Sequence, residues 1–505
     1  MRLEGFIGPA YLLNSPNVDA QRLVNMYPEK IESGFGKGAQ QFYFHPTPGL
    51  RKLLSVGDGP IRLVHVDFLN RIFVVSGNQL YLISESGGTW SSTLIGESGT
   101  SGGAAVTLGT SSGPVYAASM SFVGDGNDSS TIFVDGNTNY LFLDNVSSNG
   151  FGYLEWAGYG TIPTANKIVW SDGYFILPEG GTNKFFVSDL QSLNVDALNF
   201  ASSEGSPDIL LTLEILNRNL YLFNEQSIEY YSNTGNADFP FERVQGGFLE
   251  MGCRAKNSVV KLNNSIFFLG RSKDGTGVVY QIQGLQANRI STHAIENAIS
   301  TYADISTARA FGYQQKGHFF YVLNFDEATW VFDETTGAWH ERAYTNSGTL
   351  ERHRADCAAF DPTHNYVIVG DYSNSDVYIL DDTYFSDDGD AITRLRTCPH
   401  ISSDLDRVFY QSFQLDMEVG IGLDGGVQGS SPTVMLDFSN DGGHTWSSES
   451  WALADNIAGA IGEYKTRVKW NRLGSARDRI FRVKMTDPVK TVWIDAQIMV
   501  SKGNS

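Results

Sequence analysis

Cysteine and basic side chains are both scarce in this chain of 505 residues. Three cysteines, Cys253, Cys357 and Cys398, are too few for the disulfide framework of a small secreted domain, so we expect three reduced thiols. No run approaches 18 consecutive apolar residues, which argues against a membrane-spanning helix. The N-terminus has no apolar signal-peptide core, and we therefore expect synthesis and folding in the cytoplasm.

The 36 basic side chains stand against 56 acidic ones, a formal net charge of −20. A protein that coats nucleic acid needs a basic surface to neutralise phosphates, so the composition argues against that class. It is compatible with a protein past which nucleic acid moves without being held. Charged residues total only 18%, whereas aromatic residues reach 12% and glycine occupies 53 positions. This composition favours many short strands joined by tight turns.

A paired-strand pattern recurs along most of the chain, and repeats decide the fold class. Each instance has an apolar run, a turn rich in Gly, Asn and Asp, and a second apolar run, which is typical of a β-hairpin. The seven instances begin at Arg71, Thr131, Tyr174, Asn219, Ser265, His318 and Tyr366. Their starts lie 43 to 60 residues apart, close to the ~45 residues of a four-stranded propeller blade. The sequence therefore predicts an all-β fold with a six- or seven-bladed β-propeller.

The sixth unit carries the clearest blade signature. Asp333, Thr336 and Trp339 have the relative spacing of a kelch repeat, without its glycine pair. We expect Trp339 to pack between blades while the Asp333 turn closes the hairpin, and an ordinary hairpin with a buried Trp is the alternative. Helices are expected to be few and short, over residues 189–200 and 292–299.

Two regions lie outside the repeat, which divides the chain into 1–50, 51–395 and 396–505. Residues 1–50 contain five prolines, which exclude a long helix or a central strand, yet are too apolar for a free tail. We expect them to form an extended arm that packs on the C-terminal region. Residues 396–505 alternate polar and apolar side chains with period two, which predicts an antiparallel β domain, a sandwich or a barrel. Arm and C-terminal domain would together form one platform beside the propeller.

One turn motif in the C-terminal region resembles the Asp box of sialidase propellers. Its residues are Ser439, Asp441, Gly443, Thr445 and Trp446. We expect a structural role, in which Asp441 accepts backbone N–H groups, Gly443 takes a positive φ and Trp446 packs beneath the turn. A glycan-binding or sialidase-like glycoside hydrolase is the alternative function. A sialidase would need several such boxes, an arginine triad and a Tyr–Glu pair, which the sequence does not present as a recognisable set.

Other signatures of chemistry are weak. The sequence has no G-x-S-x-G, H-E-x-x-H, P-loop or C-x-x-C motif. The acidic turns at 125–128 and 386–390 lack a full set of six oxygen ligands for Ca²⁺, and we interpret them as solvated hairpin turns. We therefore predict a protein that is not an enzyme, with no catalytic residue, cofactor or metal ion.

Basic residues concentrate between 465 and 490, where nine of them stand against two acidic ones. Period-two alternation predicts that two consecutive strands share one basic face and one apolar face. The basic face would contain Lys465, Arg467, Lys469, Arg482 and Lys484. We interpret it as a candidate docking surface for an acidic surface of a neighbouring copy or for another ring of an assembly, and a solvated sheet face is the alternative.

Four motifs follow one another in order, at residues 21–29, 46–50, 289–296 and 472–481 (QRLVNMYPE, PTPGL, RISTHAIE and RLGSARDRIF). The ordered set spans nearly the whole chain and resembles the packaged-DNA-stabilisation proteins of short-tailed bacteriophages, the tail nozzle or hub accessory factors. The resemblance implies a structural protein of the virion tail that forms a ring, expected to be a hexamer, below the portal and adaptor proteins. It also implies retention of packaged double-stranded DNA, its passage during ejection without sequence-specific binding, and contacts with a tail needle and tail fibres or spikes.

Overall fold

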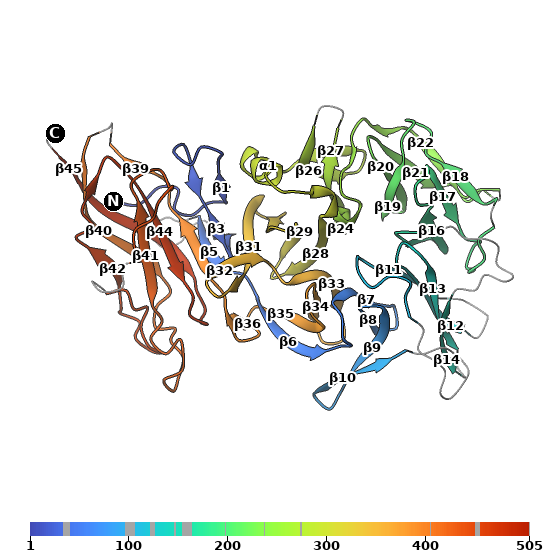
Figure 1. Cartoon of the computed structure of the whole chain (residues 1–505), viewed down its shortest axis with the longest axis horizontal. Coiled ribbons are helices and arrows are strands. Elements are labelled where there is room, and N and C mark those ends of the chain that lie inside the picture. Colours follow the sequence, from blue (N-terminus) through green and yellow to red (C-terminus); the bar gives the residue numbers. More distant parts are fainter. Residues whose placement is uncertain are drawn as a thin grey trace.

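Seven four-stranded antiparallel blades stand around a common axis, and each contains one of the hairpins predicted from the sequence (Figure 1). A computed structural model describes residues 1–503 except 34–40, 96–106, 122–126, 146–147, 154–163, 197, 237, 273–274, 404–405 and 450–454. The expected all-β propeller is therefore confirmed, and the described residues give it seven blades. The predicted hairpins supply the second and third strands of each blade.

The first six blades follow one another in chain order. Blade 1 consists of β7 (Ile61–Val66), β8 (Ile72–Ser76), β9 (Gln79–Ser86) and β10 (Thr89–Leu94). Blade 2 consists of β11 (Tyr116–Met120), β12 (Asn127–Val134), β13 (Asn139–Asn145) and β14 (Ser148–Tyr153). Blade 3 consists of β15 (Val169–Ser171), β16 (Tyr174–Pro178), β17 (Lys184–Val187) and β18 (Phe200–Ser202). Blade 4 consists of β19 (Leu210–Leu216), β20 (Asn219–Asn224), β21 (Ile228–Asn233) and β22 (Phe241–Leu249). In blade 5 the first strand is split into β23 (Gly252–Cys253) and β24 (Val260–Leu262) around the 3₁₀ helix η2 (Lys256–Ser258), and β25 (Ser265–Arg271), β26 (Thr276–Gln283) and β27 (Gln286–Arg289) follow. Blade 6 consists of β28 (Arg309–Gln315), β29 (His318–Asn324), β30 (Thr329–Asp333) and β31 (Ala338–Asn346), with β32 (Thr349–Arg352) added to β31.

Blade 7 is completed by a strand from the other end of the chain. Its first three strands are β33 (Ala355–Asp361), β34 (Tyr366–Asp371) and β35 (Asp376–Asp381), and its fourth is β6 (Gly49–Ser55). Ion pairs reinforce this closure, since Arg51 Nε lies 2.7 Å from Asp381 and Lys52 Nζ lies 2.8 Å from Asp376. Closure joins the start of the propeller to its end and leaves no blade incomplete. The first strand of the propeller in chain order is therefore β6, which begins at Gly49, two residues before the expected start of the propeller at residue 51.

Apolar alternation in the blades fills the space between neighbouring sheets. Phe223 of blade 4 meets Phe268 of blade 5 with ring centroids 5.2 Å apart, and Phe267 stacks on Tyr321 of blade 6 at 5.2 Å. Trp339 is buried against Phe332, and its indole N–H donates to the carbonyl of Ile290 at 2.9 Å. This is the inter-blade role that its kelch-like spacing predicts.

The Asp333 turn also has the predicted chemistry. Thr336 Oγ1 donates to Asp333 Oδ2 at 2.6 Å, and the backbone N–H of Thr335 donates to Oδ1 at 3.0 Å. In the preceding turn of the same blade, Lys316 and Gly317 have φ angles of 50° and 83°. Two consecutive positive φ angles are typical of the tight hairpin turn that matches strand twist, and glycine adopts the second without steric cost.

The C-terminal region forms a β-sandwich with help from the N-terminal residues. One sheet has the order β4 (Met26–Lys30), β5 (Phe42–Pro46), β45 (Trp493–Lys502), β40 (Val408–Met417) and β42 (Val468–Asn471), with β43 (Ser475–Ala476) also on β40. The other contains β3 (Leu23–Val24), β38 (Arg394–Thr397), β44 (Asp478–Met485), β41 (Val434–Ser439) and β39 (Ile401–Ser402). Buried aromatic side chains fill the space between the sheets, among them Phe413, Trp470, Phe481 and Trp493. We call the first the outer sheet and the second the inner sheet.

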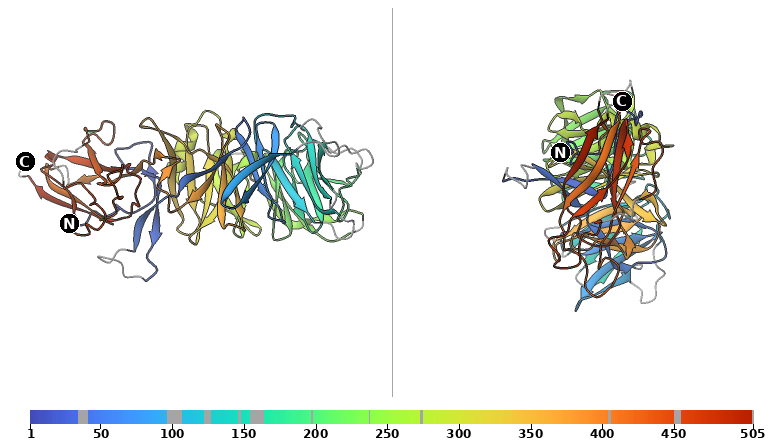
Figure 2. Two further views of the ribbon diagram at one scale, coloured as in Figure 1. Left: turned by 90° about the horizontal axis from the view of Figure 1, so that it is seen from below. Right: turned by 90° about the vertical axis from the view of Figure 1, so that its left-hand side faces the viewer.

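The inner sheet is continuous with blade 6, because β3 pairs with β31 on one side and with β38 on the other. Two small ribbons complete the sheet structure: β1 (Tyr11–Leu12) pairs with β2 (Ala20–Gln21), and β36 (Ser386–Asp387) pairs with β37 (Asp390–Ala391) and with β6. The β4–β5 hairpin stands out from the side of the elongated molecule between sandwich and propeller (Figure 2, left). Both termini lie at the sandwich end.

The first residues of the chain are held by residues near its end. The backbone N–H of Leu3 donates to the carbonyl of Ala496 at 2.8 Å, and that of Ile498 donates to the carbonyl of Met1 at 2.8 Å. The buried Arg396 donates to the carbonyls of Gly5, Phe6 and Pro9 at 2.8–3.1 Å. These contacts explain why so apolar an N-terminal segment does not hang free, and they unite it with the C-terminal β-strands.

Helix is as rare as the composition suggested. In the described part of the chain, α1 (His293–Ser300) is the only α-helix, and its N-cap is Thr292. The short 3₁₀ helix η3 (Ile305–Thr307) follows it in the chain. The second expected helix, at 189–200, is wrong. In this segment Asp189 accepts a hydrogen bond from the side chain of Asn194, and Asp196 accepts one from the backbone N–H of Leu198. Such local hydrogen bonds compete with helix formation. No helix among the described residues has the length and apolarity to cross a membrane.

Candidate functional site

The Asp-box turn has the predicted internal geometry but lies in the sandwich, after β41, rather than in the propeller. Ser439 Oγ donates to Asp441 Oδ1 at 2.6 Å, and the N–H of Thr445 donates to the same carboxylate at 2.9 Å. Hydrogen bonds from Ser439 and Thr445 hold the pKa of Asp441 well below its ordinary value. Gly443 has a φ of 94°. The Asp441 carboxylate accepts hydrogen bonds from residues of its own turn, so this geometry fits a structural role.

The same turn supports the N-terminal arm. A Cβ on Gly442 would lie 1.6 Å from the side-chain oxygen of Asn17, so the arm passes close over the turn. Next to it, His400 Nε2 lies 2.8 Å from the carbonyl oxygen of Pro16. The fifth motif residue, Trp446, is half-buried, and the guanidinium of Arg482 stacks 4.1 Å from the centre of its ring.

The five cations predicted to form one face are divided between two sheets. Lys469 lies on β42 in the outer sheet, whereas Arg482 and Lys484 lie on β44 in the inner sheet. Lys465 and Arg467 precede β42 and are exposed, because the strand begins only at Val468. Alternation along each strand is correct, but the two strands bury their apolar residues toward each other, so their polar faces point in opposite directions. The structure thus corrects the expectation of a single basic face.

The inner-sheet cations are also neutralised locally. Arg482 Nε donates to Asp437 Oδ1 at 3.0 Å in a bidentate pair, and Lys484 Nζ lies 3.1 Å from Glu449. Their carboxylate partners come from β41 and from the segment that follows it. These two cations therefore serve the packing of the sandwich rather than an open surface.

The axis of the propeller contains a hollow of about 320 Å³, lined by the first strands of the blades. Ion pairs cross it: Lys167 Nζ lies 3.3 Å from Glu214, and Arg309 Nη1 lies 2.6 Å from Asp356. Burial by itself lowers the pKa of Lys167, but the charge of Glu214, the influence of Tyr116 and the hydrogen bond to Glu214 together outweigh it, and the pKa is raised. In these two pairs each charge faces an opposite one, and each pair connects two neighbouring blades.

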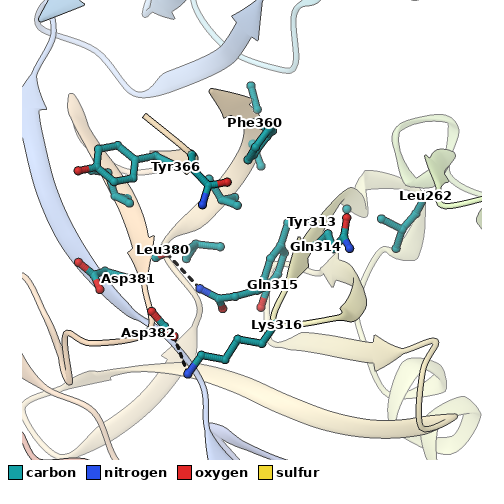
Figure 3. A pocket seen from close by; sticks show the side chains of 16 residues that line it. Leu262, Tyr313, Gln314, Gln315, Lys316, Phe360, Tyr366, Leu380, Asp381 and Asp382 are labelled. Carbon is teal, nitrogen blue, oxygen red and sulfur yellow. Dashed lines mark hydrogen bonds and ion pairs between the residues drawn. The ribbon is translucent and has the colours of Figure 1, made fainter. Parts of the chain in front are cut away.

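A hollow of about 710 Å³ opens between blades 6 and 7 at the side of the ring where first and second strands are joined (Figure 3). Tyr313 and Phe360 stand on its walls. Its two walls are bridged by Lys316, 2.6 Å from Asp382, and by Gln315, whose amide donates to the carbonyl of Leu380 at 3.4 Å. The lining combines apolar residues, three of them aromatic, with amide and charged side chains, and it suits a protein side chain or a short peptide segment.

Among the described residues, no group of three His, Cys, Asp or Glu side chains is arranged to hold a metal ion. The three cysteines are free thiols, and burial raises the pKa of Cys253 and Cys398 to about 12.

The sequence patterns did not identify two exposed apolar side chains on the outer sheet, Phe409 and Met499. The alternation of side chains in β45 places Met499 on the face opposite to Ile498. Which of the two faces is exposed is decided only when the other face packs into the sandwich.

Family models match both modules of the chain. A model described as Bacteriophage P22 Gp10, beta-propeller matches residues 16–385, and one described as Bacteriophage P22 Gp10, beta-sandwich matches residues 393–501. No curated protein matches the chain.

Solved structures with similarity to this chain include the following two, both at low sequence identity. The WD40 β-propeller domain of Doa1 is 11% identical, with a TM-score of 0.37, and the match covers 66% of this chain and 96% of that one. The extracellular domain of the one-component system BT4673 from B. thetaiotaomicron is 12% identical, with a TM-score of 0.41, over 66% of this chain and 40% of that one.

Proposed function

This chain belongs to the bacteriophage P22 Gp10 family, a family of phage tail structural proteins, and from this premise we propose that it is the subunit of a tail nozzle. Six copies form a ring below the portal and adaptor proteins. The ring retains packaged DNA, gives it a passage during ejection and carries the tail needle and tail fibres or spikes. The observation that carries the proposal is the match to both modules of one family, in order and over nearly the whole chain.

The charge of the chain supports a passage that does not hold DNA. Six copies at −20 each carry a formal charge of −120. Duplex DNA has about one negative charge per 1.7 Å of its axis. An acidic wall repels the duplex within a screening distance of about 8 Å, so DNA slides rather than binds. Retention of DNA would then rest on a mechanical block and not on attraction.

The connection between propeller and sandwich supports a subunit that withstands mechanical force. The arm, blade 6 and the inner sheet share one continuous set of strands, and the two modules are not linked by a single flexible connection. A component that withstands the pressure of packaged DNA needs this kind of rigid coupling between the parts that touch different neighbours.

Reconstitution tests the proposal directly. DNA-filled heads that carry portal and adaptor but lack this protein are incubated with the purified full-length chain, and released DNA is measured by nuclease sensitivity. We expect the chain to bind the heads, to lower the release and to appear by electron microscopy as a six-fold ring at the portal vertex. An unrelated acidic protein of similar size serves as the control. Heads that leak at the same rate with and without the chain would contradict the proposal.

A further inference from the structure

The outer sheet of the sandwich leaves one face uncovered. Along β40 and β45, Tyr410, Phe413 and Ile498 point into the sandwich and are buried. The residues that alternate with them point outward, and there Phe409 is 46% and Met499 is 55% exposed. These two large apolar side chains lie two residue pairs apart on one sheet face, on either side of the register shift between Tyr410 and Ser412. Neighbouring exposed apolar side chains of this size are typical of a surface that is covered by a partner.

Basic side chains surround these two apolar ones. Lys469 lies on β42 beside β40, Arg472 donates its backbone N–H to the carbonyl of Gln411 on β40 at 2.8 Å, and Arg407 directly precedes β40. In the part of the chain that the structure describes, none of these three cations forms an ion pair, in contrast to Arg482 and Lys484. We call the set Arg407, Phe409, Lys469, Arg472 and Met499 the sandwich face. Its chemistry selects a partner that is acidic and has apolar side chains of its own.

The propeller of the same chain has that chemistry. Residues 51–385 contain 19 basic and 36 acidic side chains, a formal charge of −17 within the −20 of the whole chain. Two propellers therefore repel each other, whereas a propeller attracts the sandwich face of another copy. Charge alone selects the propeller but not a particular side of it.

Exposed apolar side chains select the side. Phe68 and Leu69, each 45% exposed, lie in the turn between β7 and β8 of blade 1, and Phe360, 53% exposed, lies at the end of β33 in the neighbouring blade 7. All three are at the side of the ring where first strands turn into second strands, and Phe360 lines the hollow between blades 6 and 7 (Figure 3). We call Phe68, Leu69, Phe360 and this hollow the turn face.

We propose that the sandwich face of one copy docks on the turn face of a second copy. The hollow and Phe360 receive Phe409 and Met499, while Arg407, Lys469 and Arg472 meet the acidic propeller. The proposal rests on the ring of the proposed function and names the surfaces that join its subunits. Because the two surfaces differ, the contact is head-to-tail, and such a contact propagates until the ring closes.

Two full-length variants test this pairing. The first, Phe409→Asp with Met499→Asp, disables the sandwich face, and the second, Phe68→Asp with Phe360→Asp, disables the turn face. We expect each alone to associate at least about tenfold more weakly than the unaltered chain in sedimentation or mass photometry, because buried aromatic anchors dominate interfaces. Mixed in equal amounts, they should form a one-to-one dimer and stop there, since only one intact pair of faces remains. Raising the salt concentration should weaken this dimer.

Controls separate the possible outcomes. Leu285→Asp changes another exposed apolar residue, in the β26–β27 turn of blade 5, and should leave association unchanged. Unaltered thermal unfolding midpoints of all variants show that they are folded. If the unaltered chain assembles and the two double variants assemble equally well, or their mixture forms no dimer, the pairing is overturned while the nozzle proposal stands. If the unaltered chain stays monomeric at every concentration, the docking proposal fails, and the reconstitution on heads decides the nozzle independently.

Discussion

Arg22 and Glu341 form a bidentate ion pair that ties the N-terminal arm to the last strand of blade 6. Arg22 Nε lies 2.8 Å from one carboxylate oxygen and Nη2 lies 2.7 Å from the other. The residues are 319 positions apart in the chain. Beside them, the side chain of Asn25 donates to the carbonyls of Ala343 on β31 and Thr393 before β38, each at 2.9 Å. The arm is thus the physical link between the two modules.

Glu341→Gln should loosen this link. The substitution removes the charge that faces Arg22, and since Arg22 is partly exposed to solvent we expect a loss of only about 1–2 kcal/mol in the free energy of unfolding. Urea unfolding measures it. The matched control is Arg218→Ala, which breaks a pair that is mostly in water, with Asp172, and should cost less than about 0.5 kcal/mol. Equal losses in the two variants would contradict a special role for the arm contact.

Gly49→Ala should damage the closure of the propeller. A Cβ at this position would lie 2.3 Å from the carbonyl oxygen of Tyr384 and 2.4 Å from that of Ser386, and neither backbone group can move freely. We expect a destabilisation of about 1–3 kcal/mol, because overpacking forces the strand β6 away from its neighbours. Gly275→Ala, at a position where an added Cβ meets nothing within 4 Å, is the control and should be nearly neutral. Thermal unfolding and hydrogen exchange of β6 would reveal the difference, and an undisturbed β6 in the first variant would refute the argument.

His340 should make the protein sensitive to acid. Its ring is buried near Tyr27 and Phe320, neither ring nitrogen has a hydrogen-bond partner among the residues that the structure describes, and burial lowers its pKa to about 3. A histidine whose folded pKa lies below its unfolded pKa of about 6.5 costs stability as the pH falls from 6.5 toward 3, since the unfolded chain then binds the proton more readily. At pH 5 this loss is about 2 kcal/mol relative to pH 8.

His340→Phe removes that proton uptake and keeps an aromatic ring at the site. We expect its stability, measured by urea unfolding between pH 5 and pH 8, to depend less on pH than that of the unaltered chain. His293→Phe, at an exposed position on α1, is the control and should leave the pH dependence as it is. Parallel curves for the His340 variant and the unaltered chain would show that His340 does not titrate in this range.

Incubation with sialosides or neutral polysaccharides should give no turnover above the rate without protein. The one Asp-box turn lies in the sandwich, its carboxylate is engaged by Ser439 and Thr445, and the charged pairs in the propeller axis neutralise one another. Release of reducing sugar or sialic acid is the measurement, with a known sialidase as the positive control. Reproducible turnover that a single carboxylate substitution abolishes would overturn the prediction.

Local patterns determined the blades. Each hairpin is recognisable in the sequence by two apolar runs and a turn of Gly, Asn or Asp, because the interactions that form a hairpin involve only a few neighbouring residues. The Asp333 turn and the burial of Trp339 follow from the same short-range chemistry. Period-two alternation likewise predicted an antiparallel β domain over residues 396–505, and the resemblance of four ordered motifs led to the family.

Pairing between distant segments was decided only by the tertiary structure. The sequence left the number of blades open because β6 lies about 320 residues before its partner β35, and strand edges carry no mark of which distant strand completes them. The basic face failed for the same reason: alternation tells which side chains share one side of a strand, but not that β42 and β44 belong to opposite sheets. The sandwich face and the hollow between blades 6 and 7 likewise exist only once the chain has folded, since both are made by residues that the packing of other segments leaves exposed.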